Sequence, residues 1–297
     1  MSKFKPLLET MRLPFLVLTP ACVIVGVGTA YWQSSEINWL HVLLVFIGAL
    51  SAHICVNTFN EYFDFKSGLD SKTQRTPFSG GSGMLPAHPE LGRATLILAW
   101  ATFSLAAVVG AYFVWLHGWQ LLPLGLLGLL LLVTYTTWWT SHPTLSLIAP
   151  GLGFGILMVM GTHFALTGTF GWPAFIASFV PAFLVSDLLL LNQFPDVEAD
   201  QSIGRKDFPI TIGRKSSSIL YGFLLLLAYL SILAGVFLEL LPIYSLIALL
   251  TAILAWLAYR RVSQNANNIP ALIPVMGMNV IIVLTTPILL SIGLFIG

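Results

Sequence analysis

Apolar segments of membrane-spanning length fill almost the whole of this 297-residue chain. Each is near or above the roughly 20 residues that a helix needs to cross a bilayer. Only 8% of the residues are charged, too few to cover a soluble domain of this size, so lipid must be the solvent. The sequence therefore predicts an all-α integral membrane protein, one bundle of nine transmembrane helices that forms a single domain over residues 1–297. The expected helices cover residues 13–32, 38–66, 93–116, 119–139, 146–167, 172–193, 216–238, 243–262 and 270–295.

The basic residues predict how these helices are oriented. With nine alternating spans, the N-terminus and the loops near 67–92, 140–145, 194–215 and 260–269 share one side, and the opposite loops carry no Lys or Arg. Because basic residues gather in cytoplasmic loops, we expect that side to be cytoplasmic, in a multi-pass protein of the cell inner (plasma) membrane. The 13 basic residues at or near it are Lys3, Lys5, Arg12, Lys66, Lys72, Arg75, Arg93, Arg205, Lys206, Arg214, Lys215, Arg260 and Arg261.

Six of the twelve acidic residues lie in two short stretches on this same side. The first is "NEYFDFKSGLD" (60–70), and the second is "NQFPDVEAD" (192–200). A single acid at a membrane boundary is most simply a solvated helix end. Two clusters that each combine an amide with two Asp residues indicate a binding site instead, because polar groups in membrane helices are costly and mark functional positions.

Helical spacing predicts that the first cluster ends a polar stripe. At about 100° per residue, the side chains of His53, Asn57, Asn60 and Asp64 point to one face of a long helix. We expect the helix to end at Gly68, so that the next acid, Asp70, turns back toward that face.

The second cluster repeats the arrangement. Asn192, Asp196 and Asp200 recur every four residues and share one face if the segment is helical, with a kink expected at Pro195. Carboxylate and amide oxygens without clustered Cys or His suit Mg²⁺, which often binds through carboxylates and a substrate phosphate. Basic residues follow both clusters, and the loop "RTPFSGGSG" (75–83) could add N–H donors. The pattern indicates a metal-bridged diphosphate.

These residues resemble the UbiA superfamily of intramembrane prenyltransferases, over almost the whole chain. The first family motif is matched by Asn60, Glu61, Asp64 and Asp70, and the nine-helix layout also agrees. The remaining matches are Asn192, Asp196 and Asp200 for the second motif, and Arg75, Pro77 and Gly80 for the family's Arg-x-Pro-x-x-Gly loop.

Within the superfamily, the two stretches look most like the branch that prenylates 1,4-dihydroxy-2-naphthoate in menaquinone biosynthesis. Glu61 replaces the common Asp, and Phe154 stands where that branch commonly carries Glu. The segment 135–155 also lacks a Lys that some relatives place four residues after the Tyr. Alternative acceptors are 4-hydroxybenzoate, a tetrapyrrole or a prenylated glycerol phosphate.

The resemblance implies Mg²⁺-dependent transfer of an isoprenyl group from its diphosphate to an aromatic acceptor, with the prenyl tail in a groove open to membrane lipid and no role for nucleic acid. The implied Mg²⁺ ligands are Asp64, Asp70, Asp196, Asp200, Asn60 and Asn192. The implied substrate contacts are Lys72, Arg75 and Lys206 on the diphosphate, with Asn57 and His53 beside them. Loss of diphosphate leaves an allylic cation, and the aromatic candidates to stabilise it are Tyr135, Trp138 and Trp139.

A transporter is the alternative from a different class, with the acids as ion-coupling sites. It predicts acids near the middle of the membrane and an inverted internal repeat. Here the acids sit at the ends of helices, and inspection finds no such repeat. A purely structural membrane protein leaves the paired clusters unexplained.

Overall fold

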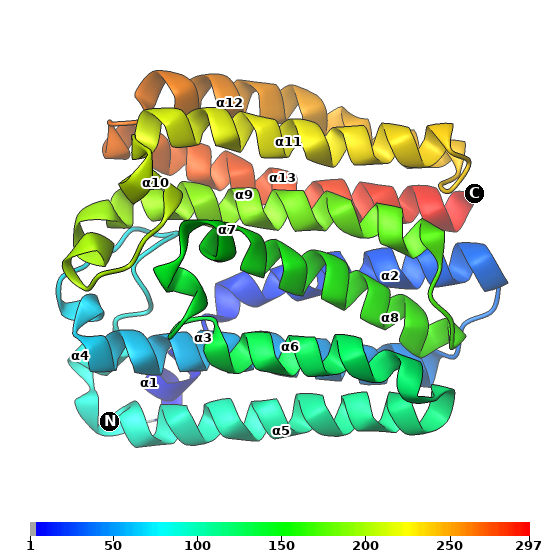
Figure 1. Ribbon diagram of the computed structural model, residues 1–297, viewed down its shortest axis with the longest axis horizontal. Helices are drawn as coiled ribbons and strands as arrows, with labels where there is room; N and C mark the ends of the chain where they lie inside the picture. Colours follow the sequence, from blue (N-terminus) through cyan, green and yellow to red (C-terminus); the bar gives the residue numbers. More distant parts are fainter. Residues whose placement is uncertain (1–3) are drawn as a thin grey trace.

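The computed structural model describes residues 4–297, so Lys3 lies outside the described residues. The described chain folds into helices without strands (Figure 1). The long helices are α2 (Leu18–Ser34), α3 (Trp39–Ser67), α5 (Gly92–His117), α6 (Leu122–Thr134), α8 (Met158–Thr167), α9 (Trp172–Ser202), α11 (Gly213–Phe237), α12 (Ala252–Asn265) and α13 (Ile269–Ile296). The shorter ones are α1 (Phe4–Glu9), α4 (Met84–Ala87), α7 (Pro143–Gly151) and α10 (Phe208–Thr211).

Within residues 4–297, eight helical segments are long and apolar enough to cross a membrane. The ninth expected span, 119–139, is helical only over Trp119–Thr134, which is shorter than the other eight. It ends in a stretch rich in β-branched residues, Val133–Thr137, which lose side-chain freedom in a helix. The sequence thus correctly predicted a multi-pass helical membrane protein, whereas nine full spans are not confirmed.

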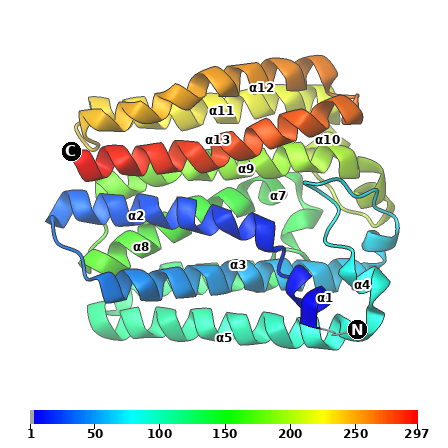
Figure 2. The same ribbon diagram turned by 180° about the vertical axis from the view of Figure 1, so that it is seen from behind.

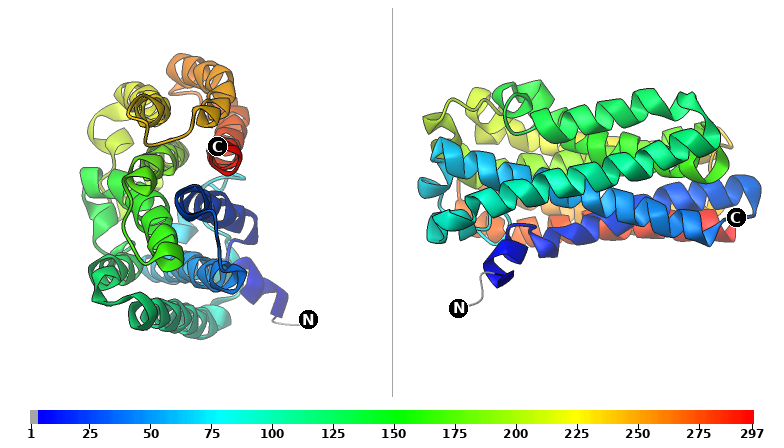
Figure 3. Two further views of the ribbon diagram at one scale, coloured as in Figure 1. Left: turned by 90° about the vertical axis from the view of Figure 1, so that its right-hand side faces the viewer. Right: turned by 90° about the horizontal axis from the view of Figure 1, so that it is seen from below.

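The helices lie side by side along the long axis of the molecule (Figures 1 and 2). The two chain ends lie at opposite ends of the bundle, and α1 projects from its side (Figure 3). The short helices α4 and α10 lie at the same end as the N-terminus (Figure 1). Both acidic stretches are at this end, which is called the acidic end below.

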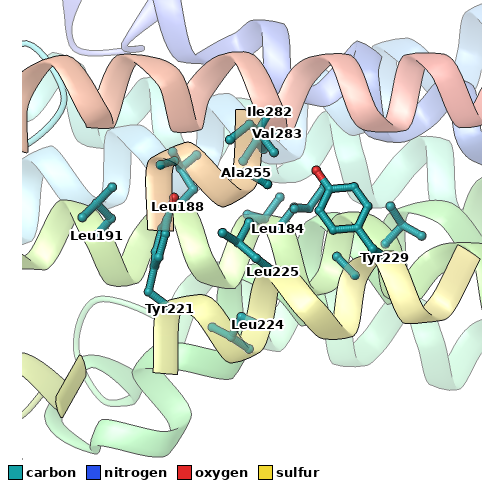
Figure 4. Packing of buried hydrophobic residues seen from close by; sticks show 14 of the residues in the cluster. Leu184, Leu188, Leu191, Tyr221, Leu224, Leu225, Tyr229, Ala255, Ile282 and Val283 are labelled. Atoms are coloured by element: carbon teal, nitrogen blue, oxygen red, sulfur yellow. The ribbon is translucent and has the colours of Figure 1, made fainter. Parts of the chain in front are cut away.

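Tight packing holds the second half of the chain together. Leucines of α9 meet aromatic and aliphatic side chains of α11, α12 and α13 in a buried cluster (Figure 4). The segment after α7 approaches α9 so closely that a Cβ on Gly155 would lie 2.4 Å from the backbone of Ala182. Small residues at such contacts let membrane helices come together, where the lipid gives no hydrophobic driving force. This packing fixes the position of α9, which carries the second acidic stretch.

Candidate active site

The polar stripe of α3 faces a cavity, as the spacing predicts. His53, Asn57, Asn60 and Asp64 all line it. The helix ends at Ser67, and the next residue, a glycine, takes a left-handed backbone conformation with φ 75°. That conformation favours glycine and reverses the chain, which buries Asp70 against the same cavity.

The second stretch approaches from the opposite wall. Helix α9 continues through Pro195 to Ser202, well beyond the expected end at 193. Asn192, Asp196 and Asp200 therefore stay on one helical face and line the same cavity as the first cluster. The fold thus brings together two stretches about 130 residues apart. The part of the cavity between them is called the mouth below.

The cavity has a volume of about 800 Å³ and is mostly apolar beyond the mouth. It runs between α3, α5, α6 and α8 toward the opposite end of the bundle, where Phe113, Leu121 and Ala165 line it. Along the way it passes several glycines, among them those at positions 110, 125 and 128. A polar mouth joined to a long apolar groove suits a ligand with a charged head and a hydrocarbon tail.

Arg205 connects the two acidic stretches. Its guanidinium donates one hydrogen bond to Asp64 on α3 and another, 3.0 Å long, to Asp200 Oδ1 on α9. Burial alone would lower the pKa of Arg205, but the charges of these two carboxylates outweigh it and raise the pKa. The neighbouring residue, Lys206, was expected at the diphosphate, but it is exposed and does not line the cavity. Both lie in an irregular segment, where spacing does not indicate which side chain points inward.

The other two basic residues expected at the diphosphate also lie outside the cavity lining. Lys72 is exposed, and Arg75 donates from Nη1 to the backbone carbonyl of Ser82 at 3.0 Å. Arg75 therefore stabilises its own loop and does not line the cavity in this structure. A different basic residue, Arg12, lines the mouth. It was missed because it precedes the first span, far in sequence from both acidic stretches.

Arg12 and Glu61 hold the mouth together. Arg12 donates from Nε to Glu61 Oε1 at 2.6 Å and from Nη2 to Asn60 Oδ1 at 2.7 Å. Ser82 adds its backbone N–H and its hydroxyl to the two oxygens of Glu61, at 2.7 and 2.5 Å. Glu61 is fully buried, and both its oxygens have partners. Its role here is to tie the N-terminal segment and the 75–83 loop to α3.

The 75–83 loop crosses the mouth from one stretch to the other. Ser79 donates its hydroxyl to Asp196 Oδ1 at 3.2 Å, while Ser82 is bound to Glu61. Between them Gly81 has φ 71°, and a Cβ there would lie 3.2 Å from Asp70 Oδ1. The glycine therefore provides both the turn and the close approach to the acids.

Other predicted residues differ in how they meet the cavity. Asn57 donates from Nδ2 to the carbonyl of Met11 at 2.9 Å, so part of its polar capacity is used by the fold. The Nδ1 atom of His53 lies 2.8 Å from the hydroxyl of Thr19, deep in the groove. His53 also lines the cavity, and its ring packs edge-on against Phe154, with the ring centroids 4.6 Å apart.

Of the three aromatic candidates, one lines the cavity and two do not. Tyr135 lines the mouth. Trp138 and Trp139 do not line the cavity, and Trp138 is 53% exposed. These two tryptophans are therefore not placed to stabilise a cation in the cavity. Asp207, an acid outside the two stretches and not expected in the site, also lines the mouth. Its Oδ1 accepts a hydrogen bond from the N–H of Ile210 and caps α10.

Two oxygen atoms at the mouth are buried without a hydrogen-bond partner, Asp70 Oδ2 and Asn192 Oδ1. Such orphaned acceptors suit a hard cation such as Mg²⁺, which prefers oxygen ligands. Within residues 4–297, however, no three His, Cys, Asp or Glu side chains form a group that could already hold a metal ion. Two of the expected ligands, Asp64 and Asp200, are instead paired with Arg205.

The pKa of one acid at the mouth, Asp70, is strongly perturbed by burial. Burial, together with the charges of Asp64 and Glu61, raises the pKa of Asp70 from its usual 3.8 to about 7. The carboxyl therefore lacks enough positive charge nearby to ionise fully at neutral pH. A bound divalent cation would supply that charge.

Comparison with known proteins identifies the family. Residues 20–280 match the UbiA prenyltransferase family, which is most of the chain. The chain belongs to this family. A solved structure of a UbiA homolog from Aeropyrum pernix K1 has the same fold, with a TM-score of 0.73 at 18% identity, over 95% of this chain and 98% of the other. A UbiA homolog from Archaeoglobus fulgidus bound to DMAPP and Mg²⁺ superposes with a TM-score of 0.68 at 16% identity, over 96% of this chain and 99% of the other.

Relatives in the family differ in their named activities. The 1,4-dihydroxy-2-naphthoate octaprenyltransferase of Bacillus subtilis is 28% identical over 65% of this chain, and the match spans 62% of that enzyme, less than two thirds. The digeranylgeranylglyceryl phosphate synthase of Pyrococcus furiosus is 26% identical over 80% of this chain and 82% of that enzyme. The first name states octaprenyl transfer to 1,4-dihydroxy-2-naphthoate, and the second states digeranylgeranylglyceryl phosphate as the product.

Proposed function

We propose that this UbiA-family protein transfers an isoprenyl group from a prenyl diphosphate to 1,4-dihydroxy-2-naphthoate, with Mg²⁺, in menaquinone biosynthesis. One observation carries the proposal: a single cavity joins a mouth lined by both acidic stretches to a long apolar groove. A prenyl diphosphate has the matching shape and polarity. The Archaeoglobus fulgidus homolog, whose structure holds DMAPP and Mg²⁺, supports the same substrate class.

The residues of the mouth would act mainly by placing charge. Asp64, Asp70, Asp196 and Asp200 would hold Mg²⁺, with Asn192 Oδ1 as a further oxygen ligand. When bound, Mg²⁺ supplies Lewis-acid stabilisation of the departing diphosphate. Arg205 and Arg12 would add positive charge toward the same oxygens.

Bond cleavage separates the diphosphate, which takes the bonding electrons, from an allylic carbocation. Tyr135, at the mouth, would present its ring to this cation. The apolar walls would exclude water that could capture the cation. The electron-rich acceptor carbon then attacks the cation, forming the new carbon–carbon bond, and the acceptor ring loses a proton, or its carboxylate as CO2, which restores its aromaticity.

The acceptor rests on the named relatives and on the two motif stretches. The Bacillus subtilis relative is named for 1,4-dihydroxy-2-naphthoate, and this is the acceptor we propose. The second candidate acceptor is a prenylated glycerol phosphate, because the Pyrococcus furiosus relative is named for the product digeranylgeranylglyceryl phosphate and matches more of this chain.

We also infer that the acidic end faces the cytoplasm, in the inner membrane. Every Lys and Arg of the chain lies at or near the loops that we assign to that side, the bias expected of cytoplasmic loops. A cysteine introduced at exposed Lys206 should then react with a membrane-impermeant thiol reagent in inverted membrane vesicles and not in intact cells.

The proposed activity is tested with purified protein in detergent. The assay supplies labelled geranylgeranyl diphosphate and Mg²⁺ with a panel of acceptors: 1,4-dihydroxy-2-naphthoate, 4-hydroxybenzoate and geranylgeranylglyceryl phosphate. We expect a Mg²⁺-dependent product with the naphthoate. The double variant Asp64→Ala, Asp196→Ala should make none, and Glu198→Ala, an acid of the same stretch that does not line the cavity, should remain active. A product with another acceptor alone would overturn the naphthoate assignment, and no product with any acceptor would overturn the activity.

A further inference from the structure

Arg205 is the one basic side chain that touches both acidic stretches within residues 4–297. It binds Asp64 with one nitrogen and Asp200 with another. Its own backbone N–H also donates to the carbonyl of Asp200 at 3.1 Å, which anchors the loop at the end of α9. The guanidinium therefore lies between two carboxylates that the proposed function assigns to metal.

The surroundings show that this position suits a cation with more charge. Asp64, Asp70 and Asp200 are each at least 93% buried. Asp70 Oδ2 and Asn192 Oδ1 remain without partners even with Arg205 in place. One guanidinium, with a single positive charge, thus pairs with two carboxylates and leaves two oxygen acceptors without partners.

We propose that Arg205 occupies the metal position in the substrate-free protein, so that the metal enters together with the diphosphate rather than before it. The inference rests on the proposed function, which it deepens. A metal ion arriving alone must compete with Arg205 for Asp64 and Asp200. A diphosphate offers the guanidinium a new partner, because the planar fork of arginine binds phosphate oxygens through two N–H groups at once. Arg205 then leaves the carboxylates to the metal and binds the phosphate oxygens.

This exchange makes the binding of metal and diphosphate mutually dependent. Because coupling between two ligands is reciprocal, diphosphate should raise the affinity for metal by the same factor by which metal raises the affinity for diphosphate. Arg205 is a positioning residue in this scheme until the diphosphate arrives.

The test measures metal binding directly, without turnover. Mn²⁺ alone is titrated into purified wild type, Arg205→Met, Arg205→Lys and the matched control Arg214→Met, with free Mn²⁺ followed by electron paramagnetic resonance. Arg214 pairs with Glu198, which is 73% exposed, and does not line the cavity. We expect Arg205→Met to bind Mn²⁺ about tenfold more tightly than wild type, a typical coupling between sites. Arg214→Met should match wild type.

Arg205→Lys keeps one positive charge and cannot bridge two carboxylates as a fork. Its affinity for Mn²⁺ should therefore lie between those of wild type and Arg205→Met. If Arg205→Met does not fold, Arg205→Lys decides by the same measurement. Retention of labelled geranylgeranyl diphosphate with and without Mg²⁺ is measured in parallel.

Unchanged or weaker Mn²⁺ binding in the Arg205 variants, with Mg²⁺-dependent retention of the diphosphate by wild type, would overturn the inference and leave the proposed function standing. If wild type does not retain the diphosphate even with Mg²⁺, the proposed function fails and this inference fails with it.

Discussion

The Nε atom of Arg12 lies 2.6 Å from Glu61 Oε1, which joins the segment before the first span to the first acidic stretch. Both oxygens of Glu61 are bound by the protein itself, through Arg12 and Ser82, and Glu61 is fully buried, whereas Glu198, whose oxygens are both bound by Arg214, is exposed. A shorter Asp at this position would not reach both partners. The longer side chain is thus explained by the clamp that it forms.

Removing this clamp should destabilise the protein. Glu61→Ala leaves the guanidinium of Arg12 without its partner, and breaking a buried ion pair costs several kcal/mol. Because the Arg12 side chain is 22% exposed, we expect a loss of about 2–3 kcal/mol. Thermal unfolding in detergent measures it. The matched control is Glu198→Ala, whose ion pair is at the surface and should contribute less than about 1 kcal/mol. Equal losses in both variants would refute the clamp.

The three basic residues outside the cavity should matter little for catalysis. We expect Lys72→Ala, Arg75→Ala and Lys206→Ala to change kcat/KM by less than about tenfold, since the wild-type side chains do not line the mouth. Arg12→Ala should cost more, about a hundredfold, because it removes charge directed at the site. Steady-state kinetics on the four variants separates the two groups. A large loss in Lys206→Ala would restore the interpretation made from the sequence.

Glycines in the groove should limit the length of the prenyl chain. A Cβ on Gly110 or Gly125 would meet no atom within 4 Å, and both residues line the cavity, so a leucine at either position adds volume to the groove wall. Gly125 is nine residues before the end of α6, about 14 Å from the mouth. Gly110 follows Val109, whose side chain lies against Gly48 of α3. Gly48 is 16 residues before Asp64, which is about 24 Å along the helix.

Each leucine should therefore shorten the longest chain accepted, and Gly125→Leu should shorten it more than Gly110→Leu. We expect about a tenfold or larger fall in kcat/KM for octaprenyl diphosphate in both, with geranyl diphosphate unaffected. Leu130→Phe, on the exposed face of α6, is the control. Chain-length profiles that match wild type in both glycine variants would show that the tail lies elsewhere.

The stability of the metal-free protein should fall as pH rises from 6 to 8. The pKa of Asp70 is raised to about 7 and that of Asp207 to about 6, in both cases chiefly by burial. An acid whose pKa is higher in the folded than in the unfolded protein stabilises the folded state fully at a pH below its unfolded pKa. This stabilisation is lost as the pH rises through the folded pKa. The free energy of unfolding should drop by about 1 kcal/mol per pH unit on average between pH 6 and 8.

Unfolding midpoints at pH 6, 7 and 8 in the presence of a chelator measure this dependence. Asp70→Asn cannot ionise and should flatten it, with the remaining slope near pH 6 due to Asp207. Stability that increases from pH 6 to 8 would contradict the assignment.

The sequence determined the parts of this protein that depend on local pattern. Apolar length gave the membrane helices, and the four-residue spacing of Asn192, Asp196 and Asp200 predicted one helical face. A glycine after Ser67 predicted the turn that buries Asp70. These features follow from helix geometry and backbone stereochemistry, which act over a few residues.

Only the tertiary structure decided which charged side chains reach the mouth. Arg205 and Lys206 are adjacent in an irregular loop, and one is turned inward by Asp64, 141 residues away. Arg12 enters the site because Glu61 and Asn60, 49 and 48 residues away, bind it. A buried charge requires a partner of opposite sign, and that partner comes from distant segments. Because packing alone brings those segments together, no local pattern could distinguish the inward arginine from the outward lysine.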